Sequence, residues 1–68
     1  MDKKIVLGAK TSKVLELIAK GRKDAEIAKE LECSYSSVRY HIDSLYRTFR
    51  TDNRGEVIYL AMKSGLLK

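Results

Sequence analysis

Apolar residues recur at helical spacing along most of this chain, and the pattern is clearest in residues 33–49, "CSYSSVRYHIDSLYRTF". At about 100° per residue, one narrow stripe of this segment is apolar. The stripe consists of Val38, Ile42, Leu45 and Phe49. The i, i+4, i+7, i+11 spacing is typical of an amphipathic helix. The segment therefore predicts a long helix with one face in a hydrophobic core.

Three further stretches predict shorter helices. Residues 11–21, "TSKVLELIAKG", carry an apolar face and stop at Gly21, a residue suited to the left-handed conformation that closes helices. Residues 24–31, "DAEIAKEL", also have helical spacing, but so short a helix must lean on its neighbours. Residues 54–65, "RGEVIYLAMKSG", follow Asn53, which with Glu56 forms a start resembling a capping box.

The link between the second and third predicted helices is very short. Only residues 32–34, "ECS", separate them, so the two helices cannot be parallel, and Ser34 is well placed to cap the third helix. Two helices joined in this way have the geometry of a helix-turn-helix. We therefore expect an all-α fold, a four-helix helix-turn-helix bundle, forming one domain over residues 1–68.

The fourth predicted helix is apolar on more than one side. Three of its residues can face the core, namely Val57, Leu60 and Ala61. Three others point elsewhere, namely Ile58, Tyr59 and Met62. The second group could belong to the core of a monomer, but a bundle this small has few places to bury it. We expect these three residues to form a dimerisation surface.

Composition narrows the range of functions. The chain has 68 residues, and a domain of this size is too small for a large enclosed active site. It has 14 Lys and Arg against 9 Asp and Glu, and the net charge of +5 favours a polyanionic partner, either nucleic acid or an acidic membrane surface. We find no nucleophile with a base, no paired carboxylates and no phosphate-binding loop, so we do not expect an enzyme.

Cysteine and histidine usage argues against metals and cofactors. The single cysteine, Cys33, excludes an internal disulfide and is expected to be a small buried hydrophobe in a reducing cytoplasm. His41 has no second His or Cys at ligand spacing, so we expect it to be partly buried or to bond a phosphate. No stretch approaches the ~18 apolar residues of a membrane span, and the start "MDKKIVLGAK" is too short and polar for a secretory signal.

The face of the long helix opposite its apolar stripe has an unusual composition. It carries Ser36, Tyr40, Asp43, Arg47 and Arg50. Ordinary solvent-facing helix surfaces are rich in Glu and Lys instead. Hydroxyls, an aromatic ring and arginines are the groups that bind phosphates and base edges in the major groove.

Several motifs occur in an order that resembles a known family. "VLELIAKG", "EIAKEL", "S..SVRYHIDSLYRTF" and "NRGEVIYLAMKSGLL" follow one another without gaps, as in the LuxR-type helix-turn-helix domain, also called the GerE or NarL type. The resemblance covers residues 7–67. It implies a four-helix DNA-binding domain whose third helix enters the major groove and whose fourth often pairs with a second copy.

The resemblance also assigns roles to residues. The family's base-facing positions fall on Ser36, Arg39, Tyr40 and Asp43. Ser34, Ser36 and Ser37 lie in the first turn, where hydroxyls can bind phosphate, although helix capping is the main role expected of Ser34. From where they project, Lys23, Arg47 and Arg50 are expected to contact phosphates, the alternative being a merely solvated face.

Two of these roles leave alternatives open. Arg39 can make a bidentate contact to guanine, whereas Asp43 either accepts from a cytosine amino group, orients a neighbouring arginine, or simply pairs with Arg47 at i+4. Tyr40 could stack or hydrogen-bond at the DNA, or its exposure could be incidental.

The sequence departs from the family pattern in a few places. The usual threonine, arginine and glutamate of the opening are Gly8, Lys10 and Thr11, which puts the start of the first helix in doubt. Lys23 replaces the serine that begins the second helix, so that helix loses a cap unless Asp24 takes over. These changes should affect docking more than the fold.

The sequence predicts a sequence-specific, double-stranded DNA-binding transcriptional regulator, acting as a homodimer through its fourth helix, with RNA polymerase as a further candidate partner. The alternative is a helical protein-interaction module that modulates another regulator or a polymerase subunit. The basic, serine-rich face of residues 33–49 favours DNA, because a protein-binding helix usually presents an apolar surface. The start of the chain suggests a stand-alone regulator.

Overall fold

The structure is a computed structural model that describes residues 5–67. This part of the chain forms four helices and no strand: α1 (Ala9–Ala19), α2 (Asp24–Leu31), α3 (Tyr35–Phe49) and α4 (Arg54–Lys63). The all-α, four-helix prediction is confirmed. The first residues of the chain, on which the expectation of a stand-alone regulator depends, lie outside the described residues.

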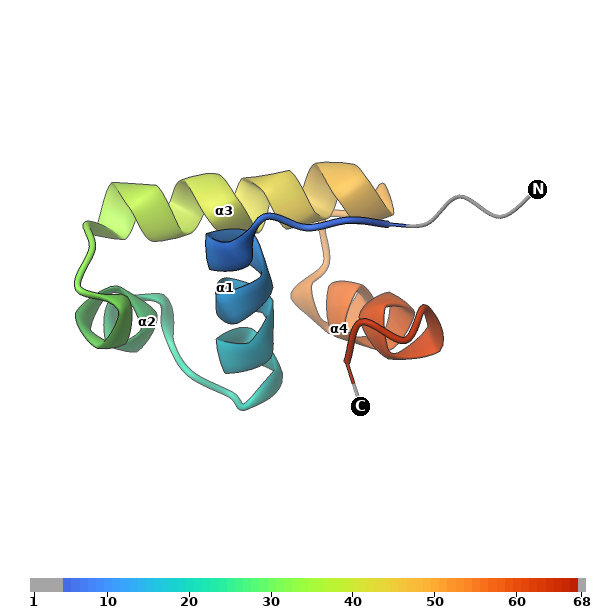
Figure 1. Ribbon diagram of the computed structural model, residues 1–68, viewed down its shortest axis with the longest axis horizontal. Helices are drawn as coiled ribbons and strands as arrows, with labels where there is room; N and C mark the ends of the chain where they lie inside the picture. Colours follow the sequence, from blue (N-terminus) through green and yellow to red (C-terminus); the bar gives the residue numbers. More distant parts are fainter. Residues whose placement is uncertain (1–4, 68) are drawn as a thin grey trace.

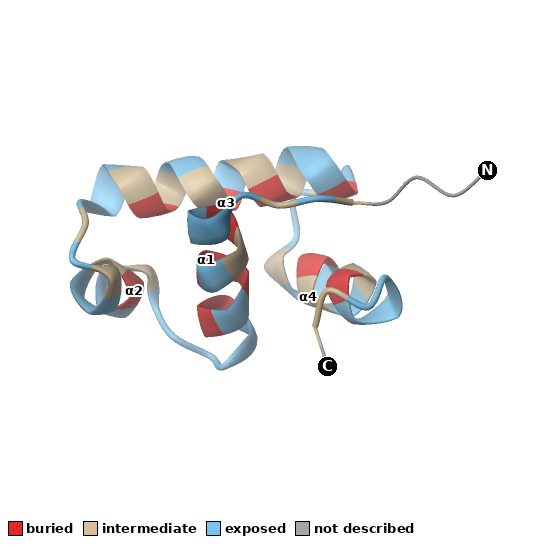
Figure 2. Cartoon of the chain, viewed as in Figure 1, coloured by how far each residue is buried: buried red, intermediate tan, exposed pale blue. Residues whose placement is uncertain are grey.

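Helix α3 organises the other three. It runs along the long axis of the molecule, and α1, α2 and α4 all lie on one side of it (Figure 1). Each of the three packs against α3. The buried side of α3 faces these helices, and its other side is exposed along its whole length (Figure 2).

The core consists of the apolar stripes that the periodicity predicts. Val38, Ile42 and Leu45 are completely buried, and Phe49 closes the stripe at the edge of the core. Val14, Leu15, Leu17 and Ile18 of α1 are buried with them, as are Ile27, Val57 and Ala61. Because α2 and α4 each supply only one or two fully buried side chains, both depend on α1 and α3 for their stability.

The ends of the helices explain why the elements stop where they do. Gly21, just beyond α1, has a φ of 83°, as expected of a glycine that closes a helix. Ser34 caps α3, because its Oγ accepts a hydrogen bond from the Ser37 N–H at 3.0 Å. Both predictions are confirmed.

The caps of α2 and α4 differ from expectation. Asp24 does not replace the missing serine cap of α2; instead the Glu26 carboxylate accepts from the Lys23 N–H at 2.8 Å. At α4, the Asn53 side chain accepts from the Glu56 N–H at 2.9 Å as predicted. The Glu56 carboxylate, however, accepts from the Thr51 hydroxyl, which itself accepts from the Asn53 N–H. Thr51 thus completes the cap that Asn53 and Glu56 were expected to form by themselves.

Helix α1 begins at Ala9, two residues before the predicted start. Thr11 therefore lies inside the helix, where it is buried, and its Oγ1 is 2.9 Å from Nδ1 of His41 on α3. This bond accounts for the partial burial of His41, which was one of the two expectations for that residue. Cys33 packs against the core but remains half-buried, so the prediction that it is buried is only partly right.

None of the helices within residues 5–67 has the length and apolar character needed to cross a membrane.

Candidate nucleic-acid interface

The exposed side of α3 is polar, cationic and aromatic. Its exposed residues are Tyr35, Ser36, Tyr40, Asp43, Arg47 and Thr48, followed by Arg50 at the C-terminal cap. Ser37 and Arg39 lie half-buried on the flank of this surface. The four core residues of α3 fix the orientation of the helix, and so the same packing holds this face outward (Figure 2). We call the exposed residues, together with Ser37 and Arg39 on their flank, the α3 face.

The N-terminal end of α3 brings several hydroxyls together. Ser34 is occupied as the cap, whereas Ser36, the second residue of the helix, is exposed. The positive end of the helix dipole and the unpaired N–H groups of a first turn both favour an anion near this end. The arrangement can bind phosphate without losing the cap.

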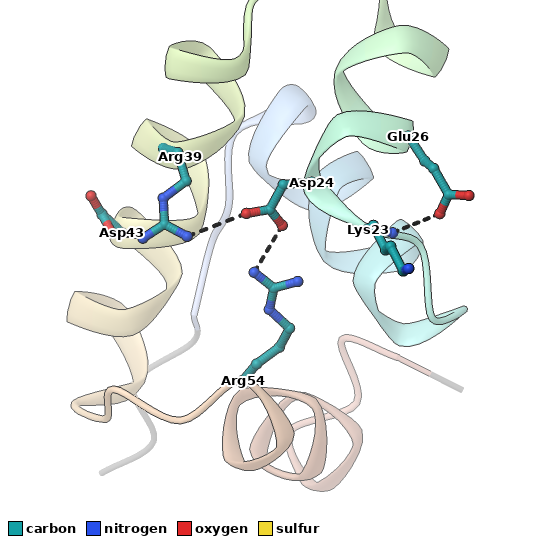
Figure 3. A network of polar contacts seen from close by, with 6 residues as sticks. All are labelled: Lys23, Asp24, Glu26, Arg39, Asp43 and Arg54. Carbon is teal, nitrogen blue, oxygen red and sulfur yellow. Dashed lines mark hydrogen bonds and ion pairs between the residues drawn. The ribbon is translucent and has the colours of Figure 1, made fainter.

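Arg39 is held in a network of ion pairs that reaches across three helices (Figure 3). One of its terminal nitrogens, Nη1, lies 3.3 Å from Oδ2 of Asp24 on α2, and the other, Nη2, lies 3.7 Å from Oδ1 of Asp43 on α3. The second oxygen of Asp24 accepts from Nη2 of Arg54 on α4 at 2.8 Å. The Asp24 carboxylate therefore lies between two guanidinium groups.

The members of this network differ in exposure. The side chain of Asp24 is only 13% exposed, against 42% for that of Arg39. Burial by itself lowers the pKa of Arg54, but the hydrogen bond that Arg54 donates to Asp24 and the interaction with the neighbouring Tyr46 hydroxyl outweigh it, and the pKa is raised above its usual value. Arg54 is thus a permanent cation. The ion pair between Arg54 and Asp24 is the shortest and most shielded contact of the network.

The network is neutral as a whole, because two arginines face two aspartates. The remaining positive charge of this region comes from Lys23 at the start of α2 and from Arg47 and Arg50 at the end of α3. Among residues 5–67, no carboxylate lies within ion-pair distance of these three side chains. They are available to an external anion.

Asp43 does not form the i+4 pair with Arg47 that was one of its expected roles. It approaches Arg39, one turn earlier, at 3.7 Å. Orientation of a neighbouring arginine is the alternative that this contact fits. The pair is long and exposed, so it contributes little to stability by itself.

Tyr40 is 64% exposed, yet its ring is not isolated. It meets the His41 ring edge to face, with ring centroids 5.4 Å apart and planes at 76°. His41 is in turn fixed by Thr11. The Tyr40 ring of the α3 face is therefore contacted by a His41 ring that is itself held in place by Thr11.

Helix α4 has its own exposed apolar surface. Tyr59 and Met62 are exposed, and Lys63 places its ammonium group 5.9 Å from the centroid of the Tyr59 ring. Ile58 is half-buried and packs against the core. Of the three residues predicted to form a dimer surface, two are thus open to a partner and one is partly used by the chain's own core.

Sequence reasoning missed three residues of this region. Asp24 was considered only as a helix cap, although it holds Arg39, and Arg54 received no role. Arg54 could have been found from the family pattern, because Asn53 and Arg54 form the "NR" of the motif that resembles it. Tyr35, exposed in the first turn of α3, was detectable as an aromatic residue directly after the cap.

A shallow groove of about 440 Å³ lies elsewhere, between the end of α1 and the C-terminal residues. It is lined by Glu16, Ala19, Lys20, Leu66 and Leu67 and includes no residue of the α3 face. Within residues 5–67, no group of three or more His, Cys, Asp and Glu side chains could hold a metal ion.

Comparison with protein families gives one match that spans most of the chain. Residues 6–61 match the model of the family described as bacterial regulatory proteins, luxR family. No curated protein matches the sequence significantly.

Comparison with solved structures returns the crystal structure of the response regulator ChrA in a haem-sensing two-component system. The TM-score is 0.87 over 97% of this chain, with 24% sequence identity. At this identity the likeness establishes a common fold. This chain spans only 33% of the length of ChrA.

Proposed function

Because this chain belongs to the luxR family of bacterial regulatory proteins, we propose that it is a sequence-specific regulator of transcription that binds double-stranded DNA with α3 in the major groove. The resemblance noted in the sequence is thereby confirmed at the level of the family. A place of action in the bacterial cytoplasm, on the chromosome, is part of the proposal, and RNA polymerase is a candidate partner.

The observation that carries this proposal is the division of α3 into two faces. One face is completely buried against the other helices, and the opposite one is exposed and carries hydroxyls, a tyrosine and arginines. The major groove of B-form DNA is about 12 Å wide, enough for one α-helix. A helix packed on one side only, and exposed over all of its length on the other, can enter such a groove without unfolding the domain.

The residues of the α3 face have separate roles in this proposal. Arg39 contacts guanine, while Ser36, Tyr40 and Asp43 contact neighbouring base edges. The three unpaired cations contact phosphates, together with the hydroxyls at the start of α3. These cations are Lys23, Arg47 and Arg50, and the hydroxyls are those of Ser34, Ser36 and Ser37. Phosphate contacts supply affinity, and base contacts supply preference for a sequence.

The experiment that tests the roles is binding-site selection from a random duplex library, carried out in parallel with Arg39→Ala and Arg50→Ala. Arg39→Ala should lose base preference at one position of each half-site, by roughly 1 to 3 kcal/mol of discrimination. Arg50→Ala should weaken binding to all duplexes alike. Equal and uniform weakening by both variants would refute this division of roles. Enrichment of no sequence by the wild-type chain would favour the protein-interaction module instead.

We also propose that two copies associate through α4. Tyr59 and Met62 are large side chains that lie exposed on this helix, and Ile58 beside them is only half-buried. A homodimer with two-fold symmetry would present two α3 faces to half-sites about one or two helical turns apart.

Sedimentation of the free and DNA-bound chain tests the dimer. Replacement of both Tyr59 and Met62 by Ser should leave a folded monomer that binds a single half-site. Val6→Ser is the control, because it removes an exposed apolar side chain that belongs neither to α4 nor to the α3 face. A double variant that assembles on DNA like the wild type would exclude α4 as the interface.

A further inference from the structure

The ion-pair network behind Arg39 suggests how the base-reading residue is kept in position. An arginine has a long side chain with many rotamers, and ordering it on binding lowers affinity. A bidentate contact to guanine also requires a defined plane for the guanidinium group. Whatever fixes that plane beforehand increases discrimination between bases.

Asp24 has the properties needed to fix Arg39. It lies on α2, so it holds the guanidinium from the protein side, at 3.3 Å, and not from the exposed α3 face. It is mostly buried, so solvent competes little for it. Asp43, by comparison, is exposed and more distant, so this second contact can open when DNA arrives.

Asp24 is itself fixed by α4. Its other oxygen accepts from Arg54 at 2.8 Å, and the two guanidinium groups hold the carboxylate from both sides (Figure 3). Because Arg54 is a permanent cation, it keeps the Asp24 carboxylate in place to hold Arg39 while Arg39 contacts a base. The position of Arg39 therefore depends on Asp43 of α3, Asp24 of α2 and Arg54 of α4. Of these, Asp24 and Arg54 do not belong to the α3 face.

We propose that Asp24 is a positioning residue that sets sequence specificity through Arg39, with Arg54 as its support. The inference rests on the proposed function, because it assigns Asp24 to the contact between Arg39 and a base. Asp24 itself touches no DNA in this scheme. Its removal should therefore change the preference for one base pair more than the total affinity.

Asp24→Asn is the direct test, because asparagine keeps the shape and removes the charge. The base pair read by Arg39 is first identified with Arg39→Ala. At that base pair, Asp24→Asn should reduce the ratio of affinities for the preferred and the substituted duplex by about two- to tenfold, the range expected for one freed side chain. At the other base pairs of the half-site the ratio should not change.

Asp52→Asn is the matched control. It makes the same change of charge at an exposed aspartate for which no ion pair is present among residues 5–67. Both variants can strengthen binding to all duplexes, because each removes a negative charge. Only Asp24→Asn should alter the ratio at the base pair of Arg39. In an Arg39→Ala background, Asp24→Asn should have no effect on that ratio.

A spectroscopic measurement on the unmodified chain covers the case in which Asp24→Asn fails to fold. Arginine side-chain NMR of the free chain should show slowed rotation of the Arg39 guanidinium, and it should remain slow in the complex. Fast rotation in the free chain overturns the proposal, whatever the rotation in the complex, as does an unchanged affinity ratio in folded Asp24→Asn. If Arg39→Ala reduces the ratio of affinities for the preferred and the substituted duplex but Asp24→Asn does not, this inference alone is wrong. If the wild-type chain prefers no duplex, the proposed function is wrong as well.

Discussion

The bond between Thr11 and His41 is an example of what a single residue does in this fold. It joins the first turn of α1 to the middle of α3, and it supports the ring against which Tyr40 packs. The only hint of it in the sequence is negative, since Thr11 stands where the family has a glutamate. A threonine on the buried side of a helix can donate to a neutral imidazole, but the partner 30 residues away is set by tertiary packing.

Thr11→Val should destabilise the domain without changing its shape. Valine fills the same volume but cannot form a hydrogen bond with His41 Nδ1, which then stays half-buried without its partner, at a cost of about 1 kcal/mol. For a domain of this size the melting temperature should fall by roughly 4–8 °C. Thr48→Val on the exposed side of α3 is the control and should change little. Equal melting temperatures for both variants would contradict the role given to the bond.

At the scale of elements, the ends of α3 combine stability with binding. Ser34 caps its first turn, and Arg50 closes its last turn in the left-handed conformation, with a φ of 56°. A non-glycine residue in that conformation is strained. Strain of this kind is common at residues that serve binding, and the phosphate contact proposed for Arg50 is such a role.

Arg50→Gly should therefore separate the two properties. Glycine relieves the strain and should raise the free energy of unfolding by about 1 kcal/mol, while the loss of the cation weakens binding to every duplex. The slope of log affinity against log salt should become less negative by about 1. The control is Glu32→Gly, at the other left-handed non-glycine residue, which should gain stability without weakening DNA binding. A variant at position 50 that is less stable than the wild type speaks against this explanation.

The cap at the start of α3 leads to a separate prediction. Ser34→Ala removes the acceptor for the Ser37 N–H and should cost about 1 kcal/mol, measured by urea denaturation. Ser36→Ala, two residues later, removes an exposed hydroxyl that forms no hydrogen bond inside the described chain. This variant should leave stability unchanged and weaken DNA binding. If Ser36→Ala lost stability and Ser34→Ala did not, Ser34 would not be the cap of α3.

At the scale of the whole molecule, four short helices share one small core. Total stability is expected to be about 3 to 10 kcal/mol for 68 residues. Leu45→Ala removes a completely buried side chain and should cost about 2–5 kcal/mol, so that all four helices are lost together on mild heating. Circular dichroism checks this result against Val6→Ala, which truncates an exposed residue. A variant that keeps α3 but loses only its neighbours would contradict a single cooperative core.

The helices and the core were predictable because both follow from local spacing. The stripe of α3, the cap at Ser34 and the bounds of α2 depend on residues within a few positions of one another. Contacts between distant helices were not predictable in this way. Asp24, Arg39 and Arg54 are far apart in sequence, and no periodicity joins them, so the network needed the packed structure. The same holds for Ile58, whose spacing alone does not reveal how much of it the core covers.

The claim on which the whole account depends is that the α3 face reads duplex DNA. The most direct test is fluorescence anisotropy of the chain with a selected duplex and with a scrambled duplex over a series of salt concentrations. We expect the selected duplex to bind at least about tenfold tighter. The slope of log affinity against log salt should be near −3 per bound chain, because about three cations meet phosphates. Equal affinity for the two duplexes at every salt concentration would contradict the account.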